Sequence, residues 1–331
     1  MRPFVVLFRS GLLFLAGLTA ISCYASAREL LLGVMPYQTP RSLLAYYQPL
    51  ASYLQSGLNR PVRLVTAPDA TQFGQRILAG EYDLVLAPAH FVRLAQKDRA
   101  WLPLARNVPD NQVFLVTRRN GPIKTVADLK GGTLATADRS MLLTLAAGRW
   151  LKTRHLEENR DYDLLETGGQ ASSIYALLIN QADVAITTLA GIRMSPGEDV
   201  QRIRVLQDIG RIPHLVFAAR PGTDKTLVSK LQQQLSSFSS PEYLRIEVLP
   251  AHALDDMDGY LEPTRRVLMS NSAGPATDMA AAQPRIMNVT TAVSVPSPRP
   301  LCPSGCSTPA GHRGPSGRGG RSVAGAMLTL K

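Results

Sequence analysis

The sequence predicts an α/β protein made of two successive units, each with strands that alternate with helices. Short apolar runs recur along the chain, amphipathic stretches of helical spacing separate them, and this alternation restarts after about residue 110. The chain has 331 residues, which is more than one hydrophobic core usually serves. Strands that alternate with helices in this way are typical of parallel sheets with crossover helices.

The first unit begins with an apolar run at 30–35, which Pro36 ends and which predicts a buried strand. Ser42 is a candidate N-cap for the helix that follows, and Gly57 is a natural stop for it. Apolar residues at helical spacing place this helix over 43–54. The remaining elements of the unit are a strand at 62–65, a helix at 71–78 that Gly80 closes, and a strand at 83–87.

The second unit repeats this pattern with a new set of strands and helices. Its apolar runs predict strands at 113–116, 133–136 and 183–186. Its helical patterns lie at 126–129, 141–151 and 172–180. A further strand at 215–218 and helices at 226–238 and 259–268 complete the predicted elements.

The N-terminus has the layout of a secretory signal peptide. Arg2 and Arg9 accompany an apolar run at 11–18, and the small triplet 25–27 precedes a polar pair, so we expect cleavage after Ala27 and a periplasmic protein. A permanent membrane helix fits less well, because polar residues soften the segment early. Lipid modification of Cys23 is the other alternative, although residues 20–22 are a poor lead-in to it.

Charge and cysteine content exclude several classes of protein. The net charge of +11 includes +2 from the leader and +5 from residues 271–331, which leaves +4 for residues 28–270. A surplus this small argues against nucleic acid as a partner and is compatible with an anionic small ligand. Residues 28–270 contain no cysteine, so we expect no disulfide and no metal-thiolate site there. We also expect no cofactor.

The C-terminal residues 271–331 differ in composition from the rest. Residues 296–321 are crowded with Pro, Gly, Ser and Arg, and such a stretch buries too little apolar surface to offset its chain entropy. We therefore expect a disordered, low-complexity tail, which a change of reading frame would also explain.

Several short segments, in order, carry a resemblance to a known family. The chain resembles periplasmic solute-binding proteins of the phosphate/phosphite/phosphonate type, the receptor components of ABC importers. The segments that carry the resemblance are Pro49-Leu50-Ala51-Ser52-Tyr53-Leu54, Gly80-Glu81-Tyr82-Asp83-Leu84, Ala87-Pro88-Ala89-His90-Phe91, Val126-Ala127-Asp128-Leu129-Lys130-Gly131-Gly132-Thr133-Leu134-Ala135, Gly168-Gly169 and Asn180-Gln181-Ala182-Asp183-Val184-Ala185.

The resemblance implies a two-lobed, type II-like binding-protein fold with two crossings between mostly parallel sheets. Lobe 1 would comprise 28–108 plus 214–270 and lobe 2 would comprise 109–213, with crossings near 104–111 and 205–213. A small anionic ligand would bind between the lobes, where strand ends and helix N-termini converge. The implied partners are the membrane subunits of an ABC transporter, and we expect a monomer.

In lobe 1, the resemblance places candidate ligand contacts directly after the first and third strands. Tyr37 and Gln38 follow the first strand, although Tyr37 could equally be an ordinary turn residue. His90 follows the third strand. Histidine suits an anionic ligand because its charge changes near neutral pH, whereas a lone histidine is more often structural.

In lobe 2, the chain departs from the family pattern at two places. Residues 141–143 are Met-Leu-Leu where phosphonate binders carry hydroxyl groups, and Gln170-Ala171 replaces a His–Asp pair. These departures weigh against a phosphonate ligand and leave the fold untouched. The remaining candidate contacts in this lobe are Arg139, Ser140, Gln170, Ser172, Ser173 and Thr188. Arg139 could hold an oxyanion with two hydrogen bonds or be a solvated loop charge, and Ser172 or Ser173 could instead cap its helix.

The sequence favours a binding protein over an enzyme, because it contains no G-x-S-x-G elbow, no phosphate loop and no H-E-x-x-H pair. The alternative is a ligand-sensing periplasmic domain related to those of histidine kinases, which would require a membrane helix after residue 270. Enzymes of pyrimidine biosynthesis share the bilobal fold, but they are cytoplasmic, and the export signal argues against them.

Overall fold

The structure, a computed structural model, describes residues 28–240, 243–250 and 252–270. The predicted leader and the predicted disordered tail lie outside these residues, so both stay predictions. Within the part of the chain that the structure describes, no helix combines the length and the hydropathy needed to cross a bilayer.

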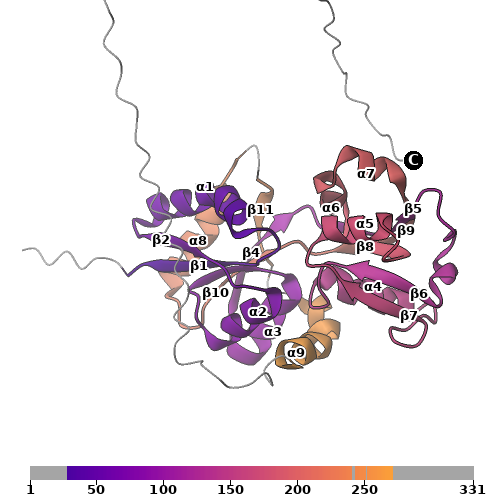
Figure 1. Ribbon diagram of the computed structural model, residues 1–331. Coiled ribbons are helices and arrows are strands. Elements are labelled where there is room, and N and C mark those ends of the chain that lie inside the picture. The colour runs from indigo at the N-terminus through magenta and orange to yellow at the C-terminus, as the bar shows by residue number, and fades with distance from the viewer. Residues whose placement is uncertain (1–27, 241–242, 251, 271–331) are drawn as a thin grey trace, which may run out of the picture. The chain divides into compact units, whose positions relative to one another are not determined.

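The strands form two mixed sheets, each with its own helices (Figure 1). We call the six-stranded sheet and its helices lobe 1, and the five-stranded sheet and its helices lobe 2. The strands of lobe 1, in the order in which they lie, are β11 (Arg245–Val248), β4 (Leu102–Val108), β10 (Val216–Ala219), β3 (Leu84–Ala87), β1 (Leu30–Val34) and β2 (Val62–Val65). Those of lobe 2 are β7 (Tyr162–Glu166), β6 (Gly132–Thr136), β8 (Val184–Thr188), β5 (Asn111–Arg118) and β9 (Ile203–Ile212).

The predicted fold class of two α/β lobes is confirmed, but the sheets are mixed and not mostly parallel as predicted. In each sheet, three neighbouring strands are parallel: β1 with β2 and β3, and β6 with β7 and β8. The strands beside the crossings make the sheets mixed, because β10 runs against β3 and β4, and β5 runs against β8 and β9.

The chain passes from lobe 1 to lobe 2 between β4 and β5, and it returns between β9 and β10. The stretches predicted as crossings are therefore mostly strand. The strands β4 and β9 that lead into the crossings were not predicted, because they carry polar groups such as Arg106, Asn107 and Gln207 where a buried strand would be apolar. β9 is an edge strand, and most of its residues are half-buried or exposed. Only the side chains that face the helices of lobe 2 need to be apolar in such a strand.

Helices cover both faces of each sheet. In lobe 1, α1 and α8 pack on one face, and α2, α3 and α9 pack on the other. In lobe 2, α4 packs on one face and α5 on the other. The helices are α1 (Pro40–Leu58), α2 (Ala70–Ala79), α3 (Ala89–Arg99), α4 (Leu142–Lys152), α5 (Gln170–Leu178), α6 (Leu189–Met194), α7 (Gly197–Arg202), α8 (Lys225–Ser237) and α9 (Leu261–Ser270), with 3-10 turns η1 (Val126–Leu129) and η2 (Asp255–Tyr260).

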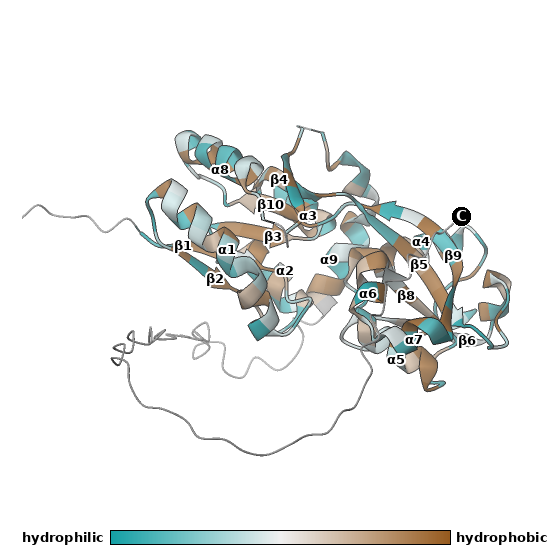
Figure 2. Cartoon of the chain, turned by 90° about the horizontal axis from the view of Figure 1, so that it is seen from above, coloured by the Kyte–Doolittle hydropathy of each residue, from teal (hydrophilic) through white to brown (hydrophobic). Residues whose placement is uncertain are grey.

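The alternation of side chains along β3 explains why this strand is apolar throughout. Leu84 and Leu86 face α1 and α8, whereas Val85 and Ala87 face α2 and α3, and all four side chains are fully buried. Figure 2 shows the result, with brown hydrophobic residues along the strands and teal residues on the outer helix surfaces.

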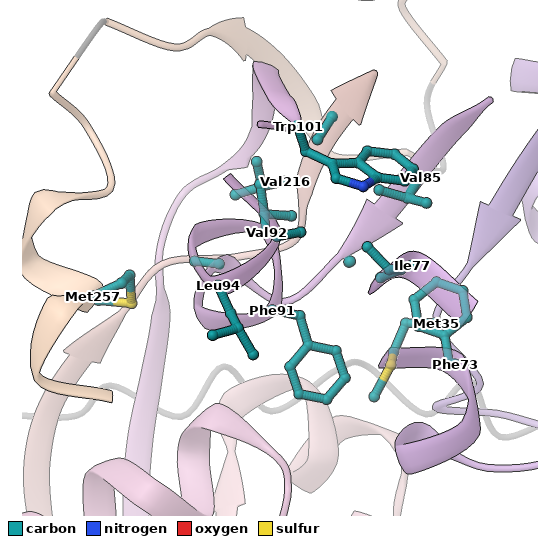
Figure 3. Packing of buried hydrophobic residues seen from close by; sticks show 14 of the residues in the cluster. Met35, Phe73, Ile77, Val85, Phe91, Val92, Leu94, Trp101, Val216 and Met257 are labelled. Atoms are coloured by element: carbon teal, nitrogen blue, oxygen red, sulfur yellow. The ribbon is translucent and has the colours of Figure 1, made fainter. Parts of the chain in front are cut away.

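The core on the α2–α3 face also receives side chains from distant parts of the chain. Phe73 and Ile77 of α2 lie near Phe91 of α3 (Figure 3). Trp101 lies next to Val85 of β3, and Met257 of η2 belongs to the same cluster. The C-terminal segment therefore packs against the first lobe.

The ends of α1 differ from the prediction. The N-cap is Thr39, whose hydroxyl accepts the backbone N–H of Ser42 at 3.3 Å, so Ser42 is not the cap. Pro40 at the first helical position suits this earlier start. The helix also continues past Gly57 and ends at Asn59, which has a left-handed backbone with φ 49°. Asparagine tolerates this conformation, which is why the glycine is not needed as a stop.

Candidate functional site

Among the described α-helices that directly follow a strand, three begin without a side-chain cap. α3, α4 and α5 follow β3, β6 and β7, and their N-cap residues are Pro88, Met141 and Gly169, none of which makes a side-chain cap hydrogen bond. By contrast, Thr39 caps α1 and Thr188 caps α6. Uncapped first turns present backbone N–H groups and the positive end of the helix dipole, so these three starts suit an anion.

Tyr37 and Gln38 lie between β1 and α1, where both are half-buried. The Tyr37 hydroxyl lies 2.7 Å from the Tyr47 hydroxyl. Burial raises the pKa of Tyr37 to about 12, and burial also raises the pKa of Tyr47. Both phenols therefore keep their protons at neutral pH, and either hydroxyl can be the donor in the bond between them.

His90 lies in the first turn of α3 and is fully buried. Its Nε2 is 2.8 Å from the backbone oxygen of Ser140, which belongs to lobe 2. Burial lowers the pKa of His90 to about 4, although the hydrogen bond to Ser140 acts in the opposite direction. At neutral pH this imidazole is uncharged, so it cannot supply the positive charge that the sequence suggested for it.

Gln170, the first residue of α5, is held by the end of β8. Its Oε1 accepts from the Thr188 N–H at 2.8 Å, the Thr188 hydroxyl at 2.9 Å and the Thr187 hydroxyl at 3.2 Å. Because all three partners donate, the amide oxygen faces them and the Nε2 hydrogens point elsewhere. The side chain of Gln170 is thus fixed with a pair of donors left at the start of α5.

The two serines of α5 have different surroundings, and neither caps the helix. The Ser173 side chain is fully buried; its hydroxyl donates to the Gly169 oxygen at 3.1 Å and lies 2.8 Å from the Thr167 hydroxyl. Ser172 is exposed, in the first turn. The cap position belongs to Gly169, since the helix starts two residues earlier than the pattern predicts.

Arg139 and Ser140 are both engaged by acidic residues. The Arg139 guanidinium donates to Glu166 at 2.8 Å and to Glu158 at 3.1 Å, and its side chain is 46% exposed. The Asp138 carboxylate accepts from the backbone N–H and the hydroxyl of Ser140. The hydroxyl of Ser140 therefore fixes its own loop, and the positive charge of Arg139 is already compensated.

The structure thus brings some candidates together and separates others. His90 meets Ser140 across the lobes, and Gln170 meets Thr188, whereas Arg139 is turned toward Glu166. Sequence reasoning missed Thr167, which joins β6 to α5 by donating to the oxygens of Thr136 and Gly169. No motif marks it, because its partners come from another strand.

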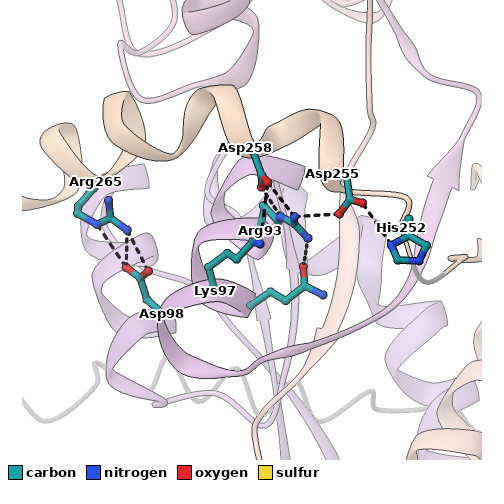
Figure 4. A network of polar contacts seen from close by, with 8 residues as sticks. Arg93, Lys97, Asp98, His252, Asp255, Asp258 and Arg265 are labelled. Atoms are coloured by element: carbon teal, nitrogen blue, oxygen red, sulfur yellow. Dashed lines mark hydrogen bonds and ion pairs between the residues drawn. The ribbon is translucent and has the colours of Figure 1, made fainter.

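Sequence reasoning also missed the anchor that holds α3. Arg93, one turn after His90, is 7% exposed and pairs with Asp258 and Asp255 of η2, while Arg265 of α9 pairs with Asp98 (Figure 4). These ion pairs join segments more than 150 residues apart in the chain. They fasten the helix that carries His90 to the C-terminal segment.

One large cavity among the described residues lies away from these helix starts. It has a volume of about 660 Å³ and is lined by η1, Trp150, Arg154 and β9. It therefore lies at the C-terminal end of α4, away from the uncapped start of that helix, and it is not the anion-binding candidate. Within residues 28–240, 243–250 and 252–270, no three His, Cys, Asp or Glu side chains gather as metal ligands.

A family model described as the periplasmic substrate-binding protein of a phosphonate ABC transporter matches residues 32–256. This match covers more than half of the chain.

Solved structures with the same fold have low sequence identity. PhnD1 from Prochlorococcus marinus, solved in complex with methylphosphonate, has a TM-score of 0.64 and 10% identity over 72% of this chain and 98% of that chain. A binding protein component of an ABC phosphonate transporter from Pseudomonas aeruginosa has a TM-score of 0.62 and 15% identity over 74% and 89%. XAC2383 from Xanthomonas citri, solved with chloride ion, has a TM-score of 0.62 and 19% identity over 72% and 98%. These likenesses show the type II-like two-lobed fold.

Proposed function

Because the chain belongs to the family of periplasmic substrate-binding proteins of phosphonate ABC transporters, we propose that it is an exported, monomeric receptor that captures a small anionic solute and presents it to the membrane subunits of an ABC importer. The uncapped helix starts of α3, α4 and α5, drawn from both lobes, are the observation that carries this proposal. A binding protein needs no catalytic groups, and closing two lobes on a ligand supplies the change of shape that a membrane partner can recognise.

Both lobes contribute proposed contacts to the ligand. From lobe 1, the Tyr37 hydroxyl and the Gln38 amide lie after β1. From lobe 2, the free Nε2 of Gln170 and the exposed Ser172 accompany the first N–H groups of α5. All of these are neutral donors, which can bind an anion without a paired cation.

The other candidates serve by holding this arrangement in place. Thr188 positions Gln170, and Ser173 positions the start of α5 through Gly169. Arg139 steadies the loop before α4 through Glu166, and Ser140 does so through Asp138.

The chemistry of α4 bears on the ligand. Met141 occupies the N-cap position of α4, and its side chain makes no capping hydrogen bond. The side chain of Leu142 is buried in the apolar cluster of lobe 1. An apolar group thus replaces the hydroxyls of phosphonate binders at this helix start. The proposed ligand class is an oxyanion or organic acid, phosphonate-like in charge, held by amides more than by hydroxyls.

A ligand panel tests the function directly. Thermal unfolding of the purified protein at pH 7.5 is measured with methylphosphonate, phosphite, phosphate, sulfate and short carboxylic acids. We expect at least one anion at 100 times its Kd to raise Tm by roughly 5 °C or more. Choline chloride and glycerol are the controls for cations and neutral solutes. A panel in which no anion stabilises the protein more than these controls would refute anion capture.

Export has its own test. We expect protein recovered from the periplasmic fraction to begin at Arg28, because the small triplet 25–27 suits signal peptidase cleavage. N-terminal sequencing or intact mass measures this. A mature protein that begins at Cys23 and carries a lipid would instead assign the leader to the lipoprotein class.

A further inference from the structure

The two lobes touch directly at the start of α3. His90 Nε2 lies 2.8 Å from the Ser140 backbone oxygen, and both residues are at most 1% exposed. Met141 and Leu142, which follow Ser140, pack against the same apolar cluster as Phe91. The contact therefore consists of the His90–Ser140 hydrogen bond and the apolar side chains of Phe91, Met141 and Leu142 around it. We call this group of residues the seam.

The partner of His90 determines its tautomer. A backbone oxygen can only accept, so Nε2 carries the hydrogen and Nδ1 is the bare nitrogen. Nδ1 is buried and has no hydrogen-bond partner among the described residues. The Phe91 ring, with its centroid 4.6 Å from that of the imidazole, is its neighbour on α3.

Protonation would change this contact sharply. A second proton would turn Nδ1 into a donor that has no acceptor, and it would place a positive charge in an apolar seam. Burial is the dominant cause of the lowered pKa of His90, and no charged group contributes to that shift.

Most of the charged side chains on the elements around α3 are bound to partners of their own. These pairs are Arg93 with Asp258 and Asp255, Lys97 with Asp258, Asp98 with Arg265, Arg265 with Glu262, Arg76 with Glu81, Arg106 with Asp110, Arg139 with Glu158 and Glu166, and Asp138 with the N–H and hydroxyl of Ser140. Arg149 of α4 lies over the Tyr260 ring of η2, and Asp256 and Arg266 are exposed. The pKa of His90 is therefore set by its burial in the seam and by its hydrogen bond to Ser140.

We propose that His90 is a positioning residue for ligand capture: in its neutral form it holds the two lobes together through Ser140, and protonation releases them. It acts on closure and needs no contact with the ligand. The proposal therefore does not rest on which solute the protein binds.

The direction and size of the effect follow from linkage. When the lobes part, His90 loses the cover of lobe 2 and its pKa returns toward the ordinary value of about 6.5. Its pKa in the closed form is lowered to about 4. Closure is therefore fully supported above about pH 6.5 and is lost as pH falls toward 4, and the ratio of closed to open protein drops roughly 30-fold between pH 7.5 and pH 5.0.

The test measures the distance between the lobes without ligand. Spin labels are placed on Ala45→Cys in α1 and Gln181→Cys after α5, both exposed, in a full chain whose three native cysteines are replaced by serine. Pulsed electron resonance should give a short distance at pH 7.5 and a growing population at longer distance at pH 5.0. A distribution that is the same at both pH values, or that lacks the short distance at pH 7.5, overturns the proposal.

Two variants separate His90 from other titrating groups. In His90→Gln the amide can still donate to Ser140 but cannot be charged, so the short distance should persist at pH 5.0. His214 is the matched control: burial also lowers its pKa to about 4, while its Nδ1 accepts from the neighbouring Leu215 N–H. His214→Gln should retain the pH response. A response that disappears in His214→Gln, or that survives in His90→Gln, overturns the assignment.

Discussion

Ser172→Glu is expected to lower the affinity of the protein for its anion on the order of 100-fold while leaving the fold intact. Ser172 is exposed in the first turn of α5, so a longer side chain finds room there. A glutamate at this position can reach back to the uncapped N–H groups of the helix and occupy the place of the ligand. Two negative charges about 5 Å apart at an effective dielectric constant of about 20 repel by roughly 3 kcal/mol, which corresponds to this loss.

The experiment separates binding from stability. Isothermal titration with the strongest anion of the panel measures Kd, and urea unfolding measures the free energy of unfolding. An acidic residue near a helix N-terminus is stabilising, so the free energy of unfolding should stay the same or rise slightly. Ser172→Gln, which has the same length and no charge, should bind within about threefold of the wild type. Wild-type affinity in Ser172→Glu would place the anion away from α5.

Arg93→Ala is expected to destabilise the protein by about 2–3 kcal/mol. The guanidinium donates to Asp258 from Nε at 2.6 Å and from Nη2 at 3.1 Å, and Nη1 donates to Gln96 at 2.8 Å. The buried stem packs between α3 and η2, so the substitution removes both packing and charged hydrogen bonds. The loss stays below the 3–5 kcal/mol typical of breaking a buried ion pair, because the carboxylate left behind is half-exposed and regains water.

Urea unfolding with and without the substitution gives this difference. Arg93→Lys should be intermediate, because lysine keeps the charge but cannot make the two-point contact with Asp258. Arg265 is the matched control, since it joins the same two segments through Asp98 but is 30% exposed. Arg265→Ala should cost much less. Equal unfolding free energies for Arg93→Ala and the wild type would show that the network in Figure 4 does not anchor the C-terminal segment.

Elements with a strong apolar pattern were predictable from the sequence. The fully buried β3 has a run of apolar residues with a turn signal on each side, and α2 ends where Gly80 adopts a left-handed backbone with φ 73°. Strands that lie at an edge or beside a crossing were harder. β9 carries polar residues on its exposed side, so its pattern did not distinguish it from a connecting segment.

The candidate site was predictable only in part. Gln170 follows β7 and Thr188 ends β8 in the parallel part of lobe 2, and the two lie near each other because the ends of parallel strands share one edge of a sheet. Partners could not be predicted in the same way. The sequence shows that Arg139 is positively charged but not which carboxylate it meets. It lies opposite Glu166 because β6 pairs with β7.

The sequence by itself determined the α/β class and the order of the main strands and helices, because these depend on local apolar periodicity. Its composition also determined that residues 28–270 contain no cysteine and hence no disulfide. Only the tertiary structure decided which groups are charged, capped or paired. His90 and Ser140 are 50 residues apart, and the neutral state of that imidazole arises from burial between two lobes that no local pattern describes.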